Sequence, residues 1–182
     1  MTNAALLIID LQNDYFIDGK MELVGINEAA QNAKRLLDYF RASKRLIVHI
    51  QHFSIKPTAT FFIPNTKGVE INEIVKPLSG EIVISKNYPN SFRDTSLKEL
   101  LHSNNIDELV ICGAMSHMCI DATTRAAFDL GFRCKVIYDA CATRDLVFNN
   151  EKVSANNVHA SFMAALASVY AKLFTTNQSL GE

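Results

Sequence analysis

Apolar residues occur along the chain in short continuous runs that alternate with stretches of helical spacing. The runs have the length and composition of buried parallel strands and occupy residues 4–9, 46–50, 82–85, 109–112 and 134–138. The helical stretches place their apolar residues on one face and cover residues 28–43, 95–103, 119–130 and 151–167. Residues 168–174 are a candidate for a sixth strand. The pattern therefore predicts strands and helices in alternation.

This alternation is typical of βαβ units, which form a parallel sheet with helices on both faces. We therefore expect a three-layer α/β/α, Rossmann-like fold in a single domain that covers residues 1–182. Asn27 is expected to cap the first helix, and Asp94 or Thr95 the second. Ligands of such sheets bind beyond the carboxyl ends of the strands, so polar residues at those ends are the candidates for chemistry.

Residues 51–80 form a long excursion between the second and third strands. The segment holds three of the four prolines of the chain, and we expect it to be mostly irregular, with one helical turn near 69–75. A loop of this length is seldom idle in a compact domain. Its apolar residues Phe61, Phe62 and Pro64 either cover a ligand pocket or pack on a neighbouring subunit.

The fourth strand leads into a sharp turn that precedes a helix. Gly113 and Ala114 let the backbone turn without a side-chain clash, and helical spacing begins at Cys119. Free backbone N–H groups and the positive end of the helix dipole favour a thiolate at that point. Cys119 is therefore a candidate nucleophile of lowered pKa. The alternative is a buried structural thiol.

Two further polar residues end strands of the predicted sheet, Asp10 after the first strand and Lys86 after the third. Because the carboxyl ends of parallel strands lie at one edge, Asp10, Lys86 and Cys119 are expected to meet in one pocket. Asp10 can accept the thiol proton and return it to a leaving group, and the ammonium of Lys86 can stabilise a thiolate. Backbone N–H groups at the turn can bind an oxyanion. Each residue alone could be an ordinary loop residue, but three at three strand ends favour a catalytic group.

Three segments carry a resemblance to a known family. Residues 7–16 read Leu-Ile-Ile-Asp-Leu-Gln-Asn-Asp-Tyr-Phe, residues 85–92 read Ser-Lys-Asn-Tyr-Pro-Asn-Ser-Phe, and residues 113–127 read Gly-Ala-Met-Ser-His-Met-Cys-Ile-Asp-Ala-Thr-Thr-Arg-Ala-Ala. They resemble, in this order, the opening, lysine and nucleophile motifs of the isochorismatase-like cysteine hydrolases. The similarity extends over about residues 4–174. Three ordered motifs are specific for the superfamily and far less so for the substrate.

The resemblance implies a six-stranded parallel sheet of order 3-2-1-4-5-6 and a homo-oligomer, either a dimer or a tetramer. It implies that Asp10, Lys86 and Cys119 form a triad that cleaves a C–N bond of a small molecule, usually of an amide, through a thioester. It further implies a cis peptide bond between Ala114 and Met115. The backbone N–H groups of Met115 and Cys119 would then form the oxyanion hole.

Five side chains in or beside the motifs are candidates for contact with the substrate. They are Phe16, His52, Tyr88, Phe92 and His117. Each of the aromatic residues is as well suited to the core as to a pocket wall. His52 follows the second strand, where a structural hydrogen-bonding role is the alternative, and His117 faces either the pocket or an interface.

The stretch after the second strand bears on metal binding. Nicotinamidases of this superfamily bind a metal through an Asp-x-His element at this place and a later histidine. The matching residues here are His49, Ile50, Gln51 and His52, so an alkyl chain stands where the aspartate would be, and no histidine lies between residues 53 and 101. An alkyl chain cannot ligate a metal. We therefore expect no metal and no cofactor.

Composition excludes several other classes of function. The chain has 182 residues, of which 48% are apolar, and a net charge of −1 without a basic stripe, so nothing favours nucleic acid or an anionic membrane. The apolar runs are too short to span a bilayer, and the first residues lack the basic segment of a signal peptide. The four cysteines have no zinc-ligand spacing. We expect a cytoplasmic protein with free thiols and a small-molecule substrate.

These observations together predict a metal-free cysteine hydrolase that acts on a small amide-like substrate. Two alternatives stay open. The first is a vinyl-ether hydrolase of the isochorismatase type, in which acid chemistry by the aspartate suffices, and the presence of Cys119 favours acyl transfer over it. The second is a non-catalytic binder or redox sensor on the same fold, in which Cys119 would be oxidised. Asp10 and Lys86 favour an enzyme over a sensor.

Overall fold

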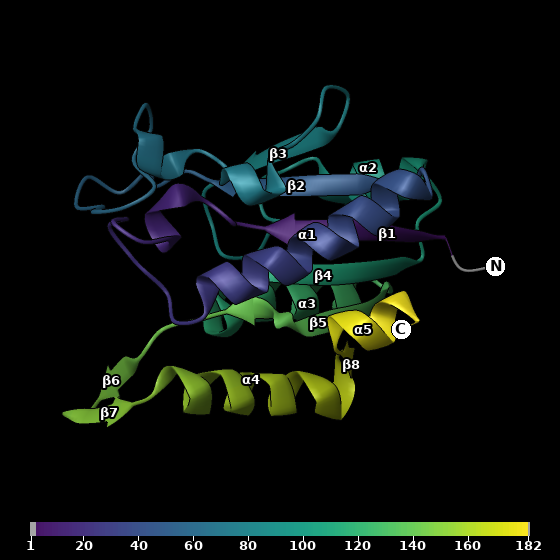
Figure 1. Cartoon of the computed structure of the whole chain (residues 1–182). Helices are drawn as coiled ribbons and strands as arrows, with labels where there is room; N and C mark the ends of the chain where they lie inside the picture. Colours follow the sequence, from purple (N-terminus) through teal and green to yellow (C-terminus); the bar gives the residue numbers. More distant parts are fainter. Residues whose placement is uncertain (1–2, 182) are drawn as a thin grey trace.

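A computed structural model describes residues 3–181 and contains a parallel sheet of six strands (Figure 1). The strands stand in the order β3-β2-β1-β4-β5-β8. Their bounds are Ala4–Ile9 for β1, Ile47–His52 for β2, Ile82–Lys86 for β3, Glu108–Ala114 for β4, Arg133–Ala142 for β5 and Lys172–Phe174 for β8. The predicted fold class and the spatial order of the six strands are confirmed, with β8 as the sixth strand of the sheet.

Helices cover both faces of this sheet. They are α1 (Ile26–Ala42), α2 (Leu97–Ser103), α3 (Asp121–Asp129), α4 (Ala155–Val169) and α5 (Thr176–Leu180). The core on one face is formed with α1 and α5, and the core on the other face with α2, α3 and α4. A three-layer arrangement results, in which α1 crosses the front of the sheet in Figure 1.

The central strand β1 shows why the apolar runs are continuous. All six of its residues are buried. Side chains alternate between the two faces of a strand, so Leu6 and Ile8 join the core under α1 while Leu7 and Ile9 join the core on the opposite face. Because both faces are covered, every position of the strand has to be apolar.

Two helix starts differ from the sequence prediction. The N-cap of α1 is Gly25, whose φ of 72° lies in the left-handed region that glycine adopts freely, so Asn27 lies inside the helix. The second helix begins at Leu97, and its N-cap is Ser96. Thr95 still contributes, because its Oγ1 accepts a hydrogen bond of 3.3 Å from the N–H of Leu97.

The segment after β5 departs most from the prediction. Residues expected to open a helix at 151 instead form an antiparallel hairpin of β6 (Leu146–Phe148) and β7 (Glu151–Val153). The helix α4 begins at Ala155, because Ser154 caps it by accepting a hydrogen bond of 3.3 Å from the N–H of Asn157. In Figure 1 the hairpin projects beyond the end of α4. No helix among residues 3–181 has both the length and the apolar character needed to cross a membrane.

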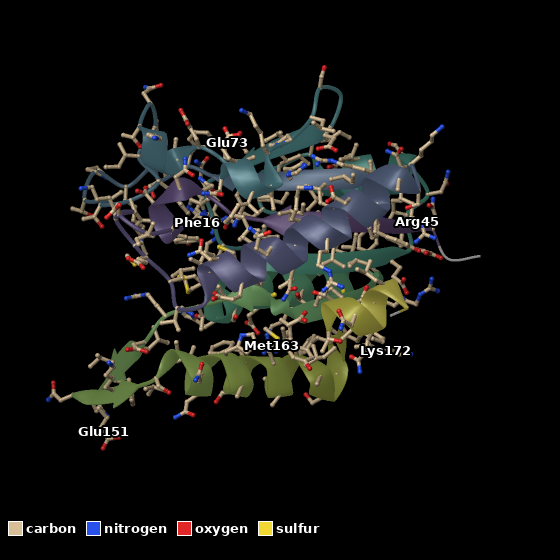
Figure 2. The ribbon with its side chains drawn as sticks, in the orientation of Figure 1. Phe16, Arg45, Glu73, Glu151, Met163 and Lys172 are labelled. Carbon is tan, nitrogen blue, oxygen red and sulfur yellow. The ribbon has the colours of Figure 1, made fainter. Side chains whose placement is uncertain are left out.

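The carboxyl ends of β1 to β5 lie on the left in Figure 1, at the same end as most of the long excursion of residues 53–81. This excursion contains two short 3₁₀ turns, η2 (Lys67–Val69) and η3 (Glu73–Val75), where one turn was predicted. Figure 2 shows Phe16 at this end of the molecule and Arg45 at the opposite end. The edge predicted to hold the site is therefore covered by the excursion.

Candidate active site

The turn after β4 brings Cys119 to the carboxyl edge of the sheet. The peptide bond between Ala114 and Met115 is cis, as the family resemblance implies. A π-helical turn, η4 (Ser116–Ile120), follows, and the carbonyl of Met115 accepts hydrogen bonds from the N–H groups of Met118 and Ile120 at 3.0 and 3.2 Å. Cys119 therefore lies inside this turn, and the helix α3 begins only at Asp121, two residues later than predicted.

Gly113 determines how closely this turn approaches β1. Its φ is 125°, and a Cβ built there would lie 2.0 Å from the carbonyl oxygen of Ile9. Any other residue would therefore force β4 away from β1 at the point where both strands end. Since Asp10 directly follows Ile9, this close contact also sets the distance between Asp10 and the turn that carries Cys119.

Asp10 and Lys86 meet at the same edge from two different strands. Asp10 follows β1 with a φ of 54°, and its N–H donates to the carbonyl of Ile50 at 3.0 Å. Lys86 is the last residue of β3, and its Nζ lies 2.8 Å from Oδ2 of Asp10 and donates to the carbonyl of Pro89 at 3.1 Å. Both side chains are 0% exposed. The predicted convergence of the strand ends thus brings these two charges into contact.

Cys119 completes the group with His52 beside it. Sγ of Cys119, a carboxylate oxygen of Asp10 and a ring nitrogen of His52 all lie within 4.8 Å of one another. Cys119 is 4% exposed. The three residues of the predicted triad therefore lie together, and sulfur and carboxylate are close enough for a proton to pass between them after a small side-chain movement.

The ion pair with Asp10 keeps the Lys86 ammonium charged. Burial alone would lower the pKa of the Lys86 ammonium, but the nearby Asp10 carboxylate and Cys119 outweigh this, and the pKa is raised from its ordinary value. An ammonium and a carboxylate in contact cancel each other's charge. The resting site therefore holds one buried ion pair and no net charge as long as Cys119 stays protonated.

The prediction of a lowered pKa for Cys119 is wrong for this closed site. Burial and the Asp10 carboxylate raise the pKa of the thiol, and Lys86 only partly offsets them. A thiolate would place a second negative charge next to Asp10 in a dry environment. The helix dipole considered from the sequence also counts for less, because the sulfur lies in the π turn ahead of α3. Cys119 is therefore a neutral thiol in this site.

Sequence reasoning missed the role of Gln12, which holds His52 in place. Oε1 of Gln12 accepts a hydrogen bond of 2.7 Å from the N–H of His52, and its Nε2 donates to the carbonyl of His52 at 2.9 Å. Nε2 also donates to the carbonyl of Val69 at 2.7 Å, in the excursion. Gln12 is fully buried. The sequence offered one indication of this role, because Gln12 lies two residues after Asp10, inside the first motif.

The excursion supplies an aromatic wall that also involves the first motif. Phe62 is 1% exposed. The centroid of its ring lies 4.6 Å from the ring centroid of Tyr15 and 5.8 Å from that of His52. The Asp14 carboxylate anchors this segment by accepting a hydrogen bond of 2.6 Å from the N–H of Phe62. Burial, followed by the proximity of Cys119 and Asp10, raises the pKa of the Tyr15 hydroxyl well above its usual range, so it stays neutral. Of the two roles left open for Phe62, covering the site is the one observed.

The other candidates for substrate contact lie in less direct positions. Phe16 is buried in the core under α1, and the ring of Tyr88 is covered by the guanidinium of Arg93 at 3.6 Å. Phe92 stacks on Phe132, which directly precedes β5, with 6.1 Å between the ring centroids. Contact of these three aromatic residues with a substrate stays a prediction.

His117 is held at the rim of the site. Its Nδ1 lies 2.6 Å from Oγ1 of Thr143, which follows β5. Burial, and then the charge of Arg144, lower the pKa of the His117 imidazole. His117 is therefore a neutral ring that links the π turn to the end of β5.

The metal ligand set of the nicotinamidases does not fit these residues. Ile50 lies inside β2, is 1% exposed and packs in the core, so no oxygen is present at that place. Its neighbour His49 is bonded elsewhere, with Nε2 2.9 Å from Oε2 of Glu81. We therefore assign no step to such a metal.

A parallel α/β sheet with a buried cysteine, aspartate and lysine at its carboxyl edge defines a class of hydrolase scaffold, and comparisons with known proteins identify the family. The model of the isochorismatase domain matches residues 4–178. The chain belongs to the isochorismatase family and is an isochorismatase-family hydrolase.

Three similar proteins illustrate this membership. An uncharacterised isochorismatase family protein, YddQ of Bacillus subtilis, is 52% identical over 97% of this chain and 98% of its own. The crystal structure of a candidate isochorismatase hydrolase from Oleispira antarctica matches with a TM-score of 0.95 and 46% identity over 100% of this chain and 97% of its own. The maleamate amidohydrolase of Pseudomonas putida is 30% identical over 77% of this chain and 72% of its own.

Proposed function

We propose that this protein is a cysteine hydrolase that cleaves the C–N bond of a small amide-like substrate through a thioester intermediate. The observation that carries the proposal is the grouping of the Cys119 thiol with the Asp10–Lys86 ion pair, in which Nζ lies 2.8 Å from Oδ2 and the sulfur lies within 4.8 Å of the carboxylate. The similarity to a maleamate amidohydrolase supports an amide as the substrate class.

In the first half of the reaction, Sγ of Cys119 attacks the carbonyl carbon as its proton passes to the Asp10 carboxylate. The raised pKa of the thiol fits this coupled transfer, because a free thiolate is disfavoured until the carbonyl takes up the charge. The negative charge then develops on the carbonyl oxygen, where the backbone N–H groups of Met115 and Cys119 stabilise it. The C–N bond breaks, and Asp10 gives its proton to the departing nitrogen.

In the second half, water replaces the amine. Asp10 accepts a proton from the water, whose oxygen attacks the thioester carbon, and the proton then returns to the sulfur as the acid leaves. Lys86 stays protonated throughout and keeps Asp10 in position through their ion pair. The resting state is restored without any change in the net charge of the site.

The experiment that tests this proposal is a screen of small amides, ureides and N-carbamoyl compounds with detection of released ammonia. Intact-protein mass spectrometry on the active substrates should show an acyl adduct on Cys119. We expect Cys119→Ser to lose at least about 10³-fold in kcat/KM. The matched control is Cys134→Ser, because Cys134 lies at the amino end of β5 and should leave turnover unchanged.

The two alternatives give different results in the same experiment. Hydrolysis of a vinyl ether that persists in Cys119→Ser would favour the isochorismatase-type reaction. Reversible oxidation of Cys119 without turnover of any amide would favour a redox sensor. Either result would overturn the proposal of amide hydrolysis.

A further inference from the structure

Three side chains at the site also carry the donor atoms of a metal centre. Sγ of Cys119, a ring nitrogen of His52 and a carboxylate oxygen of Asp10 lie within 4.8 Å of one another, with Nδ1 of His52 3.9 Å from Oδ2 of Asp10. Thiolate, imidazole and carboxylate are preferred ligands of Zn²⁺, with bonds of about 2.0–2.3 Å. A tetrahedral ion with such bonds holds its ligand atoms about 3.3–3.8 Å apart. Small side-chain rotations would therefore close the site around an ion.

The Asp10 carboxylate has one oxygen that can accept a further ligand. The carboxylate is fully buried, and while Oδ2 contacts the ammonium of Lys86 at 2.8 Å, Oδ1 has no hydrogen-bond partner within the described residues 3–181. Buried carboxylate oxygens are rarely left without a partner. Oδ1 therefore keeps a full complement of lone pairs available to a cation.

Hydrogen bonds to Gln12 hold His52 in a position that suits a metal ligand. Both its N–H and its carbonyl are bonded to the side chain of Gln12, at 2.7 and 2.9 Å, which fixes the residue relative to Asp10. A neutral imidazole ring at this position offers a nitrogen lone pair to a cation next to Asp10 and Cys119.

We propose that Zn²⁺, or another thiophilic divalent cation, binds to Asp10, His52 and Cys119 and reversibly inhibits the enzyme. The ion forms a bond to Sγ, and the thiol proton leaves to solvent, so that one cation enters as one proton departs. A sulfur bound to the metal no longer attacks a carbonyl. The ion binding stands by itself, whereas the inhibition rests on the proposed function.

The charge balance explains why the ion would be an inhibitor and not a resident cofactor. With a protonated Cys119, the charges of Asp10 and Lys86 cancel. With Zn²⁺ and a Cys119 thiolate, the site carries a net charge of +1, because the Lys86 ammonium stays next to Asp10. This ammonium repels the ion and weakens its binding relative to zinc sites without a neighbouring cation. Binding should therefore be reversible by a chelator.

The test uses Co²⁺ as a spectroscopic substitute on the full-length protein. We expect one Co²⁺ per chain with a thiolate-to-cobalt charge-transfer band, which Zn²⁺ displaces and Mg²⁺ does not. Cys119→Ser, with Cys119→Ala as a second variant, should abolish the band, and His52→Gln should weaken Co²⁺ binding at least about tenfold. Two matched controls, His102→Gln in the last turn of α2 and Cys134→Ser, should bind as the unmodified protein does, and circular dichroism confirms the fold of each variant.

Several results would overturn the proposal. They are the absence of the band, its persistence in Cys119→Ser, or binding that His52→Gln does not change. In a second arm, Zn²⁺ should abolish amide turnover and a chelator should restore it. Cobalt binding together with full activity in Zn²⁺ would refute the inhibition alone. If no amide is hydrolysed at all, the proposed function and the inhibition fail together, while the spectra still decide whether the metal site exists.

Discussion

Nζ of Lys86 lies 2.8 Å from Oδ2 of Asp10, although the strands that carry the two residues are not neighbours in the sheet. β2 stands between β1 and β3, and the contact forms only because both side chains extend over the carboxyl end of β2. Both are completely buried. The ion pair therefore links β3, next to the excursion, to the central strand β1 and fixes the Asp10 carboxylate next to Cys119.

This geometry predicts that turnover requires the Asp10–Lys86 ion pair, whereas two uncharged residues in its place would keep most of the free energy of unfolding. Removal of one partner from a buried pair costs about 3–5 kcal/mol, because the other charge is left uncompensated. We expect Asp10→Asn to lower the free energy of unfolding by about that amount and to reduce kcat by about 10²–10⁴. Urea unfolding and ammonia release measure the two effects.

The matched control is the double variant Asp10→Asn/Lys86→Met, which removes both charges. It should regain most of the lost stability because no charge remains buried, yet it should stay inactive because the base is missing. A double variant as unstable as Asp10→Asn would show that the Lys86 charge is not the source of the cost. A double variant with full activity would rule out Asp10 as the proton acceptor.

Much of the fold and the meeting of Asp10, Lys86 and Cys119 were predictable from the sequence, for one physical reason. Continuous apolar runs mean strands buried on both faces, and parallel strands bring their carboxyl ends to one edge whatever their distance in the chain. The hairpin of β6 and β7 was not predictable in this way. Its residues Val147 and Phe148 are more than 70% exposed, so they carry no pattern of burial.

The parts of the site that depend on exact packing could not be predicted from the sequence either. The pKa of Cys119 follows from burial and from its distance to Asp10, and neither can be read from spacing. The stacking of Phe92 on Phe132, a residue 40 positions further along the chain, could not be read from the motif either. Gln12 was visible in the first motif, but its two bonds to His52 depend on the register of β1 and β2.

The bonds of Gln12 predict a large effect of an almost isosteric substitution. Gln12→Glu replaces Nε2 with an oxygen that faces the carbonyl oxygens of His52 and Val69, at 2.9 and 2.7 Å. A buried acceptor opposite two acceptors loses both bonds and should cost about 2–3 kcal/mol or force protonation of the carboxyl. We expect a fall in kcat/KM and a shift of the His52 ring resonances in the NMR spectrum.

Gln51→Glu is the matched control for this change. Nε2 of Gln51 donates to the same carbonyl of Val69 at 2.9 Å, but within the described part of the chain this half-buried side chain makes no hydrogen bond to His52. We expect a smaller loss of stability, about 1 kcal/mol, and unchanged His52 resonances. Equal effects of the two substitutions would mean that Gln12 acts through the excursion alone and does not position His52.

The final prediction concerns stability against acid and is independent of the reaction. Glu81, which precedes β3, accepts hydrogen bonds from Nε of Arg41 at 2.6 Å and from the N–H of Leu78 at 2.9 Å, and its Oε2 lies 2.9 Å from Nε2 of His49. Burial would raise the pKa of this carboxyl, but these partners, with Arg41 foremost, lower it to about 2. In the unfolded chain its pKa is about 4.3. Glu81 therefore binds a proton more readily in the unfolded state.

Because the pKa is depressed by folding, the stabilisation is complete above about pH 4.3 and is lost as the pH falls towards 2. The side chain is 12% exposed, so solvent screens part of the attraction, and we expect Glu81→Gln to cost about 1–2 kcal/mol at pH 7. The difference between the two proteins should shrink steadily in urea unfolding below pH 4.3 and nearly vanish at pH 2. A difference that stays constant over this range would show that Glu81 stabilises the fold through shape and neutral hydrogen bonds and not through its charge.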